Sequence, residues 1–327
     1  MTQERVNKAI DFLREATAYL KNHPEEFKNN NNNNNKDSLS ETEYNDIENK
    51  IKDFVNLKLS ESIKYKPKIG VFGKTGAGKS SLCNAIFGKK ISEVSDIKAC
   101  TRTLNEIPVG NMTLVDAPGI GETIERHIEY RNLYKEFAQQ CDLILWVMKA
   151  DDRAYAEAQD IYENDLKSGC PVFIVLSQID KIAPHREWNW DTFEPGPNQI
   201  KNIEEKINEV KDAFRIDPSH ISYVSIDTEA SETDINFNLE TLLERIISTI
   251  PNKKKASIYR ETKKEIRTEK IEKKVEKGFI EYALDTAEEF AYRYFPVLKT
   301  PFFKKPIRKM KEYIANGAKS LFKSIFG

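Results

Sequence analysis

The chain has 327 residues, with 51 lysines and arginines against 52 aspartates and glutamates, and a net charge of −1 at pH 7. At about 100–200 residues per domain, this length predicts about two domains and a sizeable core. Hydrophobic residues make up 39% and charged residues 31%, which indicates a globular protein with long, solvated helices. The near-zero net charge argues against a protein that coats nucleic acid over its whole surface.

Cysteine spacing and hydropathy exclude four further classes. The four cysteines, at 83, 100, 141 and 170, have no C-x-x-C spacing, so neither a zinc ribbon nor a disulfide framework is indicated. The longest apolar run, residues 143–148, is too short to span a bilayer, and the N-terminal residues lack a signal-peptide core. We therefore expect a cytoplasmic protein, with peripheral attachment to a membrane as the alternative.

Residues 1–63 form the first predicted domain. They hold two helical patterns separated by seven consecutive asparagines at 29–35, a tract that cannot bury apolar surface and that we expect to be a disordered linker. Ser40 and Glu43 form a capping-box signature for the second helix, which should run to about residue 62.

Residues 64–252 form the second predicted domain, in which short β-branched runs alternate with helical patterns. This alternation is typical of a doubly wound α/β fold with a mostly parallel sheet. Segments 132–140 and 200–214 predict crossover helices. The runs that predict buried strands are 69–72, 112–115, 143–148, 172–176 and 221–224.

Residues 253–327 form a basic, helical third region, since 251–327 holds 20 lysines and arginines against 10 acidic residues. Two helices are predicted, over about 257–294 and 306–326. The second carries an apolar stripe opposite basic residues, which is typical of a helix that binds an anionic membrane surface or a protein partner. Alternatively, the stripe packs on the chain's own helices. The facing stripe would then consist of Ile266, Ile271, Val275 and Phe279.

A phosphate-binding pattern stands between a predicted strand and a predicted helix. The sequence G-K-T-G-A-G-K-S at 73–80 fits G-x-x-x-x-G-K-[ST], in which glycines let backbone N–H groups surround phosphates at a helix N-terminus. Lys79 would neutralise β and γ oxygens, and the Ser80 hydroxyl would ligate Mg²⁺. The alternative is a glycine-rich structural turn. The predicted nucleotide-binding residues are Gly73, Lys74, Thr75, Gly76, Ala77, Gly78, Lys79, Ser80 and Ser81.

A carboxylate and a hydroxyl complete the predicted switch. Asp116 ends the predicted strand 112–115 and opens D-A-P-G, in which the aspartate would reach Mg²⁺ through its shell and the Gly119 N–H would read the γ-phosphate. Alone, such a sequence would be a loop carboxylate capping a turn. Thr101 is the first choice for the hydroxyl that closes onto Mg²⁺, and Thr103 is the reserve. The predicted metal ligands are Ser80, Thr101 and Asp116, and the predicted catalytic residues are Lys79, Thr101 and Gly119.

Together with S-Q-I-D at 177–180, these motifs resemble those of the Era/TrmE-like P-loop small GTPases. The strings GKTGAGKSSLCNAIFG, EYRNLY, LWVMKADDRA and HREW are similar to those of an uncharacterised bacterial branch of that superfamily. The resemblance covers about residues 64–252. It implies a Mg²⁺-dependent protein that binds GTP and GDP and hydrolyses GTP, and it supports Thr101, which precedes an arginine, over Thr103.

The base-reading residues depart from the family pattern N-K-x-D. Asp180 can accept hydrogen bonds from N1–H and N2–H₂ of guanine, which adenine lacks. Ser177 replaces an asparagine that braces the site, and Gln178 replaces a lysine that covers the ring, so the resemblance implies guanine preference with modest affinity. The alternative for Asp180 is a helix N-cap. Ser225 and Ile226 match the family's last base loop weakly, and the Ile226 N–H is the expected contact.

Water activation also departs from the family. Ile120 stands where Ras-like enzymes carry the glutamine that orients the attacking water, so we expect unaided hydrolysis near or below about 10⁻⁴ s⁻¹. Some relatives use a potassium ion held by an asparagine, but Gly76 occupies that position. Arg153, acting across a dimer at the nucleotide face, is one group that could assist in trans. The alternative is an ordinary solvated arginine.

Two functions fit this sequence. The first is a nucleotide switch whose N- and C-terminal helices pack together into one helical unit. This unit would signal to an anionic membrane surface or protein partner through 306–326. The second is a protein that dimerises with GTP through the nucleotide face, with incidental hydrolysis. RNA or ribosome association is a lesser alternative, because 253–327 lacks a G-x-x-G loop and the strands of an RNA-binding sheet. Trp188 and Trp190, in an insertion at 184–197, are expected to pack on the domain's own surface, or else to cover the base or bind a partner.

Overall fold

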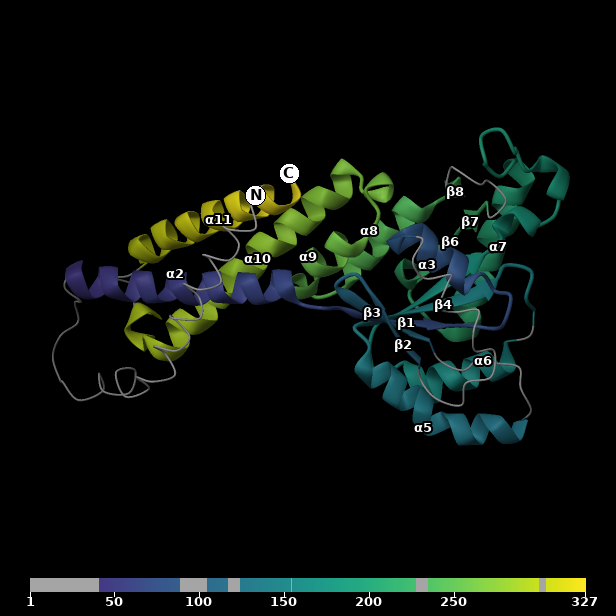
Figure 1. The fold of residues 1–327 in the computed structure, drawn as a ribbon, viewed down its shortest axis with the longest axis horizontal. Coiled ribbons are helices and arrows are strands. Elements are labelled where there is room, and N and C mark those ends of the chain that lie inside the picture. The colour runs from purple at the N-terminus through teal and green to yellow at the C-terminus, as the bar shows by residue number, and fades with distance from the viewer. Residues whose placement is uncertain (1–40, 89–104, 117–123, 154, 228–234, 300–303) are drawn as a thin grey trace. The chain divides into compact units, whose positions relative to one another are not determined.

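Two compact units make up the described part of the chain. The first, called the sheet unit, comprises Lys66–Ile250 and Glu261–Glu272. The second, called the helical unit, comprises the residues up to Tyr65 together with Pro251–Arg260 and Lys273–Gly327. The structure is a computed structural model that describes residues 41–88, 105–116, 124–153, 155–227, 235–299 and 304–327 (Figure 1). The predicted helix at the start of the chain and the asparagine tract at 29–35 lie outside these residues.

The sheet unit contains eight strands among its described residues. All five predicted strands are present, with boundaries that agree to within one residue. They are β1 (Lys68–Phe72), β3 (Met112–Asp116), β4 (Leu143–Lys149), β5 (Val172–Ser177) and β6 (Ile221–Tyr223), and the others are β2 (Asn105–Val109), β7 (Ser225–Ile226) and β8 (Asn236–Phe237).

Six of these strands form one sheet in the order β2-β3-β1-β4-β5-β6. All neighbouring pairs are parallel except β2 and β3, so the predicted mostly parallel, doubly wound fold is confirmed. The edge strand β2 was not predicted from the sequence. It alternates buried Ile107 and Val109 with exposed residues, but one of the exposed residues is Pro108, which argues against a strand. Proline is tolerated in sheets at such edges.

Helices of the sheet unit cover the sheet and carry its aromatic core. Phe72 of β1 contacts Tyr134 and Trp146, with ring centroids 5.1 and 4.9 Å apart. Helix packing is close at Gly70, where a Cβ would lie 2.6 Å from the Phe137 ring. The helices are α3 (Lys79–Phe87), α5 (Ile124–Gln140), α6 (Ala156–Ile161), η1 (Tyr162–Leu166), η2 (Ile179–Lys181), η3 (His185–Glu187), α7 (Pro197–Phe214), η4 (Pro218–His220), α8 (Leu239–Thr249) and η5 (Lys264–Ile266).

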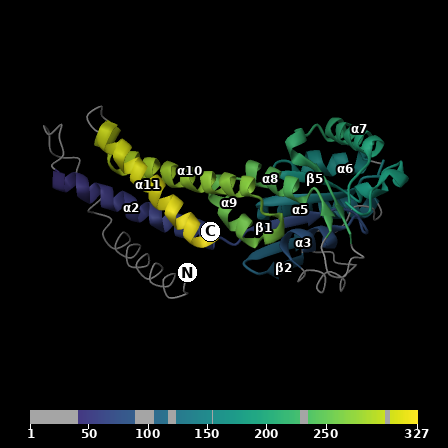
Figure 2. The same cartoon turned by 90° about the horizontal axis from the view of Figure 1, so that it is seen from above.

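The helical unit is built from both ends of the chain. Its α2 (Glu41–Lys64) and α11 (Lys304–Phe326) lie in contact (Figure 2). Phe54 of α2 stacks on Phe290 of α10 (Glu269–Tyr294) with ring centroids 4.3 Å apart, and Phe279 of α10 meets Phe322 of α11 at 5.9 Å. The helices are α2 (Glu41–Lys64), α9 (Asn252–Glu261), α10 (Glu269–Tyr294), η6 (Pro296–Lys299) and α11 (Lys304–Phe326).

The apolar stripe of α11 packs on the chain's own helices, as one of the two alternatives expected. Its four central residues are at most 5% exposed, while the basic residues on the opposite side of the helix are exposed. No helix among the described residues is long and apolar enough to cross a bilayer. The buried residues of the stripe are Met310, Ile314, Ala318 and Phe322.

The predicted single helix over 257–294 is wrong. The backbone between α9 and α10 leaves the helical path, since the Lys263 N–H donates to the Ile86 carbonyl oxygen at 2.8 Å. Thr268 then starts α10 as its cap, accepting a hydrogen bond at 3.3 Å from a backbone N–H of the first turn. Ile266 therefore lies in η5, and the predicted facing stripe loses its first member.

Candidate nucleotide-binding site

A glycine-rich loop joins β1 to α3 at the carboxyl end of the central strand. Gly73, Gly76 and Gly78 have φ angles of +144°, +76° and +87°, in a region where a side chain is strained. At Gly73 a Cβ would also collide with the Val147 carbonyl oxygen of β4. Glycine at these positions therefore shapes the loop and lets it approach the neighbouring strand.

The N-terminus of α3 lies directly behind this loop. Gly78 is the N-cap, and none of the described side chains caps the first turn. The N–H groups of a helix's first turn, together with the helix dipole, attract anions. Lys79 and Ser80 add an ammonium and a hydroxyl at the same place, so the residues present fit a phosphate group, and the Ser80 oxygen belongs to the ligand class of Mg²⁺.

The ammonium of Lys79 lies against its own loop. It donates to the carbonyl oxygens of Gly73 at 3.0 Å and Lys74 at 3.3 Å. Neutral carbonyl groups hold this charge more weakly than phosphate oxygens would, because a phosphate adds the Coulomb attraction between opposite charges. The ammonium is therefore placed to exchange these contacts for a bound anion.

Ser177 connects the end of β5 to the loop. Its side chain is buried, and its hydroxyl oxygen lies 2.7 Å from the Ala77 carbonyl oxygen and 3.1 Å from that of Met148. The residue therefore braces the phosphate loop against β4 and β5, although serine is shorter than asparagine.

Gln178 makes a second contact to the loop. Its backbone is in the left-handed region, with φ +58°, and its side-chain amide donates to the Gly76 carbonyl oxygen at 3.0 Å. Lys181 donates to the other end of the same amide at 2.8 Å. The glutamine is thus fixed between the phosphate loop and η2.

Asp180 and Ser225 meet although 45 residues separate them. The Ser225 hydroxyl donates to the Asp180 carboxylate, which links η2 to β7. Next to Ser225, Ile226 pairs with Asn236 in β8, while the flanking Asp227 N–H bonds Ile235. Because hydrogen-bonded pairs alternate along antiparallel strands, the Ile226 N–H points away from β8.

Comparison with known proteins agrees with this geometry. The family model of the 50S ribosome-binding GTPases matches residues 68–178. The uncharacterized proteins YfjP and YkfA of Escherichia coli K12 are 40% and 34% identical over 194 and 228 residues. These matches cover 57% and 68% of this chain, and 63% and 75% of YfjP and YkfA. GTPase Era of Clostridium botulinum Alaska E43 is 32% identical over 123 residues, 36% of this chain and 42% of Era.

The chain belongs to the Era-like P-loop GTPases. Domains of this family bind and hydrolyse GTP. The phosphate loop, Ser177, Gln178 and Asp180 of the Era-like domain are thus brought to one edge of the sheet, because the parallel strands β1 and β5 end there.

Several predicted switch residues of the Era-like domain lie outside the part of the chain that the structure describes. Thr101, Thr103, Gly119 and Ile120 fall outside the described residues. Asp116 is the last residue of β3, where its backbone pairs in register with Val71 of β1. The strand therefore ends at the same edge as the phosphate loop.

The turn after β4 packs against the phosphate loop of the Era-like domain. Asp152 lies 3.8 Å from the Lys74 ammonium, and its carbonyl oxygen accepts hydrogen bonds from Tyr155 at 2.9 Å and from Lys206. Burial raises the pKa of Tyr155, so this phenol stays protonated and able to donate. Arg153, the predicted finger residue, is exposed.

The two tryptophans of the insertion differ in burial. Trp188 is 4% exposed and packs edge-on against Phe193 and Phe237, so the packing predicted for it is found. Trp190 is 65% exposed, although its ring touches Trp188 at 6.3 Å between centroids. Its indole therefore remains mostly accessible.

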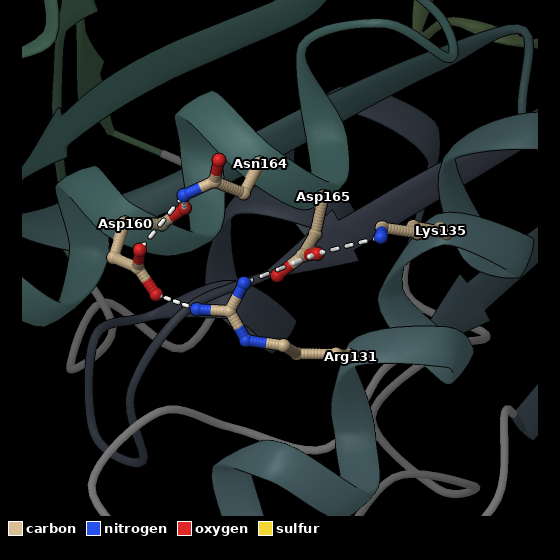
Figure 3. Close-up of polar contacts among 5 residues, drawn as sticks. All are labelled: Arg131, Lys135, Asp160, Asn164 and Asp165. Atoms are coloured by element: carbon tan, nitrogen blue, oxygen red, sulfur yellow. Dashed lines mark hydrogen bonds and ion pairs between the residues drawn. The ribbon is translucent and has the colours of Figure 1, made fainter.

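A buried carboxylate joins α5 to η1 (Figure 3). Asp165 is 1% exposed, with Arg131 at 3.9 Å and Lys135 at 3.7 Å as its charged neighbours. Burial raises the pKa of Asp165, and the two cations oppose this shift. Arg131 also pairs with Asp160 of α6, which accepts a hydrogen bond from Asn164 at 2.7 Å. The cluster fixes the helix that follows the D-x-x-G motif.

One residue beside the phosphate loop was not predicted from the sequence. Lys149 ends β4, and its ammonium lies next to Gly76. The available signal was a charged residue closing an otherwise apolar strand of seven residues.

Proposed function

We propose that this protein is a Mg²⁺-dependent GTP-binding protein and slow GTPase that acts as a nucleotide switch. The observation that carries the proposal is the convergence on one glycine-rich loop of the Lys79 ammonium, the Ser177 hydroxyl and the Gln178 amide. Phosphate and base recognition are mechanically joined by these contacts. A chain that needed only a turn between β1 and α3 would not need a lysine and two distant polar side chains to bond that turn.

The loop and Lys79 bind the phosphates in this proposal. The N–H groups at the start of α3 donate to phosphate oxygens, and Lys79 moves from the Gly73 and Lys74 carbonyl groups to the β and γ oxygens. Guanine is read by the Asp180 carboxylate, which Ser225 orients, and by the Ile226 N–H.

Ser80, Asp116 and Thr101 are the proposed residues for Mg²⁺. A bound Mg²⁺ neutralises charge on the β- and γ-phosphates. Ser80 offers its hydroxyl in the first turn of α3, and Asp116 stands at the end of the adjoining strand. Thr101 and Gly119 would sense the γ-phosphate and relax after hydrolysis.

The helical unit is the proposed output of the switch. An exposed row of cations on α11 supports an anionic membrane surface or an acidic protein partner. Since the apolar stripe of α11 is buried, binding would be electrostatic and would not require insertion.

Nucleotide titration of the full chain tests the proposal. We expect submicromolar to micromolar binding of GTP and GDP with Mg²⁺, weaker binding of ATP, and a loss of at least about tenfold for Lys79→Ala. Lys201→Ala is the matched control, because Lys201 is an exposed lysine on α7. Equal binding by Lys79→Ala and wild type would exclude the phosphate-loop assignment, and equal competition by ATP and GTP would exclude the role of Asp180.

GTP-dependent assembly is the second candidate, supported by the exposure of Arg153, which follows the Asp152 that faces Lys74 of the phosphate loop. Turnover measured against protein concentration separates the two. A steep rise that Arg153→Ala abolishes would support assistance across a dimer, whereas a specific activity independent of concentration would support the single-chain switch.

A further inference from the structure

Lys149 holds a fixed place between the phosphate loop and the base-reading segment. It is the last residue of β4 and pairs in register with Ser177 of β5. Behind it, the Asp152 N–H donates to the Lys149 carbonyl oxygen at 3.1 Å and closes a turn. Tyr155 and Lys206 hold the far end of that turn through the Asp152 carbonyl oxygen. The backbone that carries Lys149 is therefore anchored on both sides.

The Lys149 side chain reaches the middle of the phosphate loop. A Cβ placed on Gly76 would lie 3.6 Å from the Lys149 ammonium and 3.8 Å from its Cε. Gly76 is the residue whose carbonyl oxygen Gln178 binds. The ammonium is thus adjacent to the loop segment that is expected to surround the phosphates.

Among the described residues, Lys149 makes no ion pair and no hydrogen bond. In this it differs from Lys74 and Lys79, the two lysines of the phosphate loop. Lys74 faces Asp152, and Lys79 donates to two carbonyl groups. Lys149 is a half-buried residue, and an ammonium without a carboxylate beside an anion-binding loop is most strongly stabilised by the anion itself.

We propose that Lys149 is a second phosphate-contacting cation, supplied by the chain itself, which acts in GTP hydrolysis more than in GTP binding. This inference rests on the proposed function. In the reaction, the water oxygen forms a bond to the γ-phosphorus while the bond from that phosphorus to the β,γ-bridging oxygen breaks. The electron pair of that bond stays on the β-phosphate of GDP. One proton of the water stays on inorganic phosphate, and the other passes to a phosphate oxygen or to solvent.

Negative charge therefore grows on the leaving oxygen as the reaction proceeds. An ammonium already held beside the loop stabilises this charge without reorganising, which lowers the barrier more than it tightens the ground state. Lys149 would act on the phosphate charge, a role separate from the orientation of water that Ile120 cannot provide.

The test compares single-turnover GTP hydrolysis and GDP affinity for full-length wild type, Lys149→Met and Lys149→Arg, with Lys201→Met as the control. Methionine keeps the length of the side chain without its charge. We expect Lys149→Met to slow hydrolysis by about 10- to 100-fold while GDP affinity falls less than about threefold, and we expect arginine to restore much of the rate. Unchanged thermal unfolding of the variants shows that the fold is kept.

The outcomes separate this inference from the function on which it rests. If wild type fails to bind GTP, the proposed function fails, and this inference fails with it. If wild type binds and hydrolyses GTP and Lys149→Met does so at the same rate, only the role of Lys149 is overturned. An equal loss of affinity and rate in Lys149→Met, or a wild-type chain that binds GTP without hydrolysing it, also overturns that role.

Discussion

At the scale of single residues, the site depends on polar side chains that bond the backbone of the phosphate loop. Ser177 and Gln178 replace larger or charged residues of the family pattern, and both still reach the loop, at 2.7 and 3.0 Å. The departure from N-K-x-D therefore keeps the connection between the base-reading segment and the phosphate loop. It removes the lysine that would cover the base.

Ser177→Ala should weaken both the fold and the nucleotide site. The change leaves the buried Ala77 carbonyl group without the Ser177 hydroxyl, at an expected cost of about 1–2 kcal/mol in the free energy of unfolding. GTP affinity should fall as well, because the loop loses its brace. Urea unfolding and GTP titration measure the two effects, with the exposed Ser168→Ala as the control. Wild-type stability in Ser177→Ala would contradict the bracing role.

Asp180→Asn should change the preferred base. Xanthine carries an oxygen where guanine carries N2–H₂, so an asparagine amide that donates favours xanthosine triphosphate over GTP. We expect GTP affinity to fall by at least about tenfold, the value of one lost hydrogen bond to a charged group. Competition between the two nucleotides measures the change, with Asp191→Asn, an exposed aspartate, as the control. A variant that still prefers GTP would show that Asp180 does not read the base.

At the scale of elements, regular patterns predicted the strands and helices well and their interruptions poorly. Buried parallel strands are short apolar runs with β-branched residues, so β1 and β4 were recognisable from local sequence alone. The break between α9 and α10 depends on a hydrogen bond from Lys263 to Ile86, which is 177 positions away in the chain. No local pattern contains that information.

The cluster between α5 and η1 gives a prediction about pH. Burial raises the pKa of Asp165 above its usual value, so the folded chain holds this proton more tightly than the unfolded chain does. The stabilisation from this group is complete below the ordinary aspartate pKa of about 4 and is lost as pH rises through the raised folded-state pKa.

Arg131→Met should therefore destabilise the chain more at pH 7 than at pH 4.5. The change removes one of the two cations that offset the buried charge, at an expected cost of about 1–3 kcal/mol at pH 7. Asp165→Asn should cost little or nothing at pH 7, because the amide carries no charge to bury. Thermal unfolding at both pH values measures these effects. A larger loss in Arg131→Met at the lower pH would contradict the raised pKa.

At the scale of the whole molecule, charge is divided along the chain. Residues 251–327 carry twice as many basic as acidic residues, and the remainder is acidic, so the net charge of −1 conceals a basic helical end. In the structure, α11 buries its apolar stripe and leaves its cations outward. The exposed cations are Lys304, Lys305, Arg308, Lys309, Lys319 and Lys323.

This distribution predicts salt-dependent binding to anionic vesicles. Each lysine or arginine near an anionic surface contributes about 1 kcal/mol, so Lys309→Gln, Lys319→Gln and Lys323→Gln together should weaken binding by about 100-fold. Sedimentation with phosphatidylserine-containing and with neutral vesicles measures the fraction of protein bound. A triple lysine-to-glutamine change at exposed positions of the sheet unit is the control. Equal binding to neutral vesicles, or binding of RNA in preference to vesicles, would contradict the membrane proposal.

The sequence by itself determined the five parallel strands of the main sheet and the phosphate loop, because each strand is a local apolar run and the loop's strand, glycines and helix are contiguous. The tertiary structure alone decided which distant residues meet this loop. Ser177 reaches Ala77 across 100 positions, and Lys149 comes to lie beside Gly76.

The position of the α11 stripe was also decided only by the fold. An amphipathic pattern states that one face of a helix needs an apolar partner, but the same pattern fits a membrane, another protein or the chain itself. Here α2 and α10 supply the partner, because α2 from before the sheet unit in the sequence packs with α10 and α11 from after it. Periodicity is a local property of sequence, whereas the choice of partner depends on which surfaces the folded chain brings together.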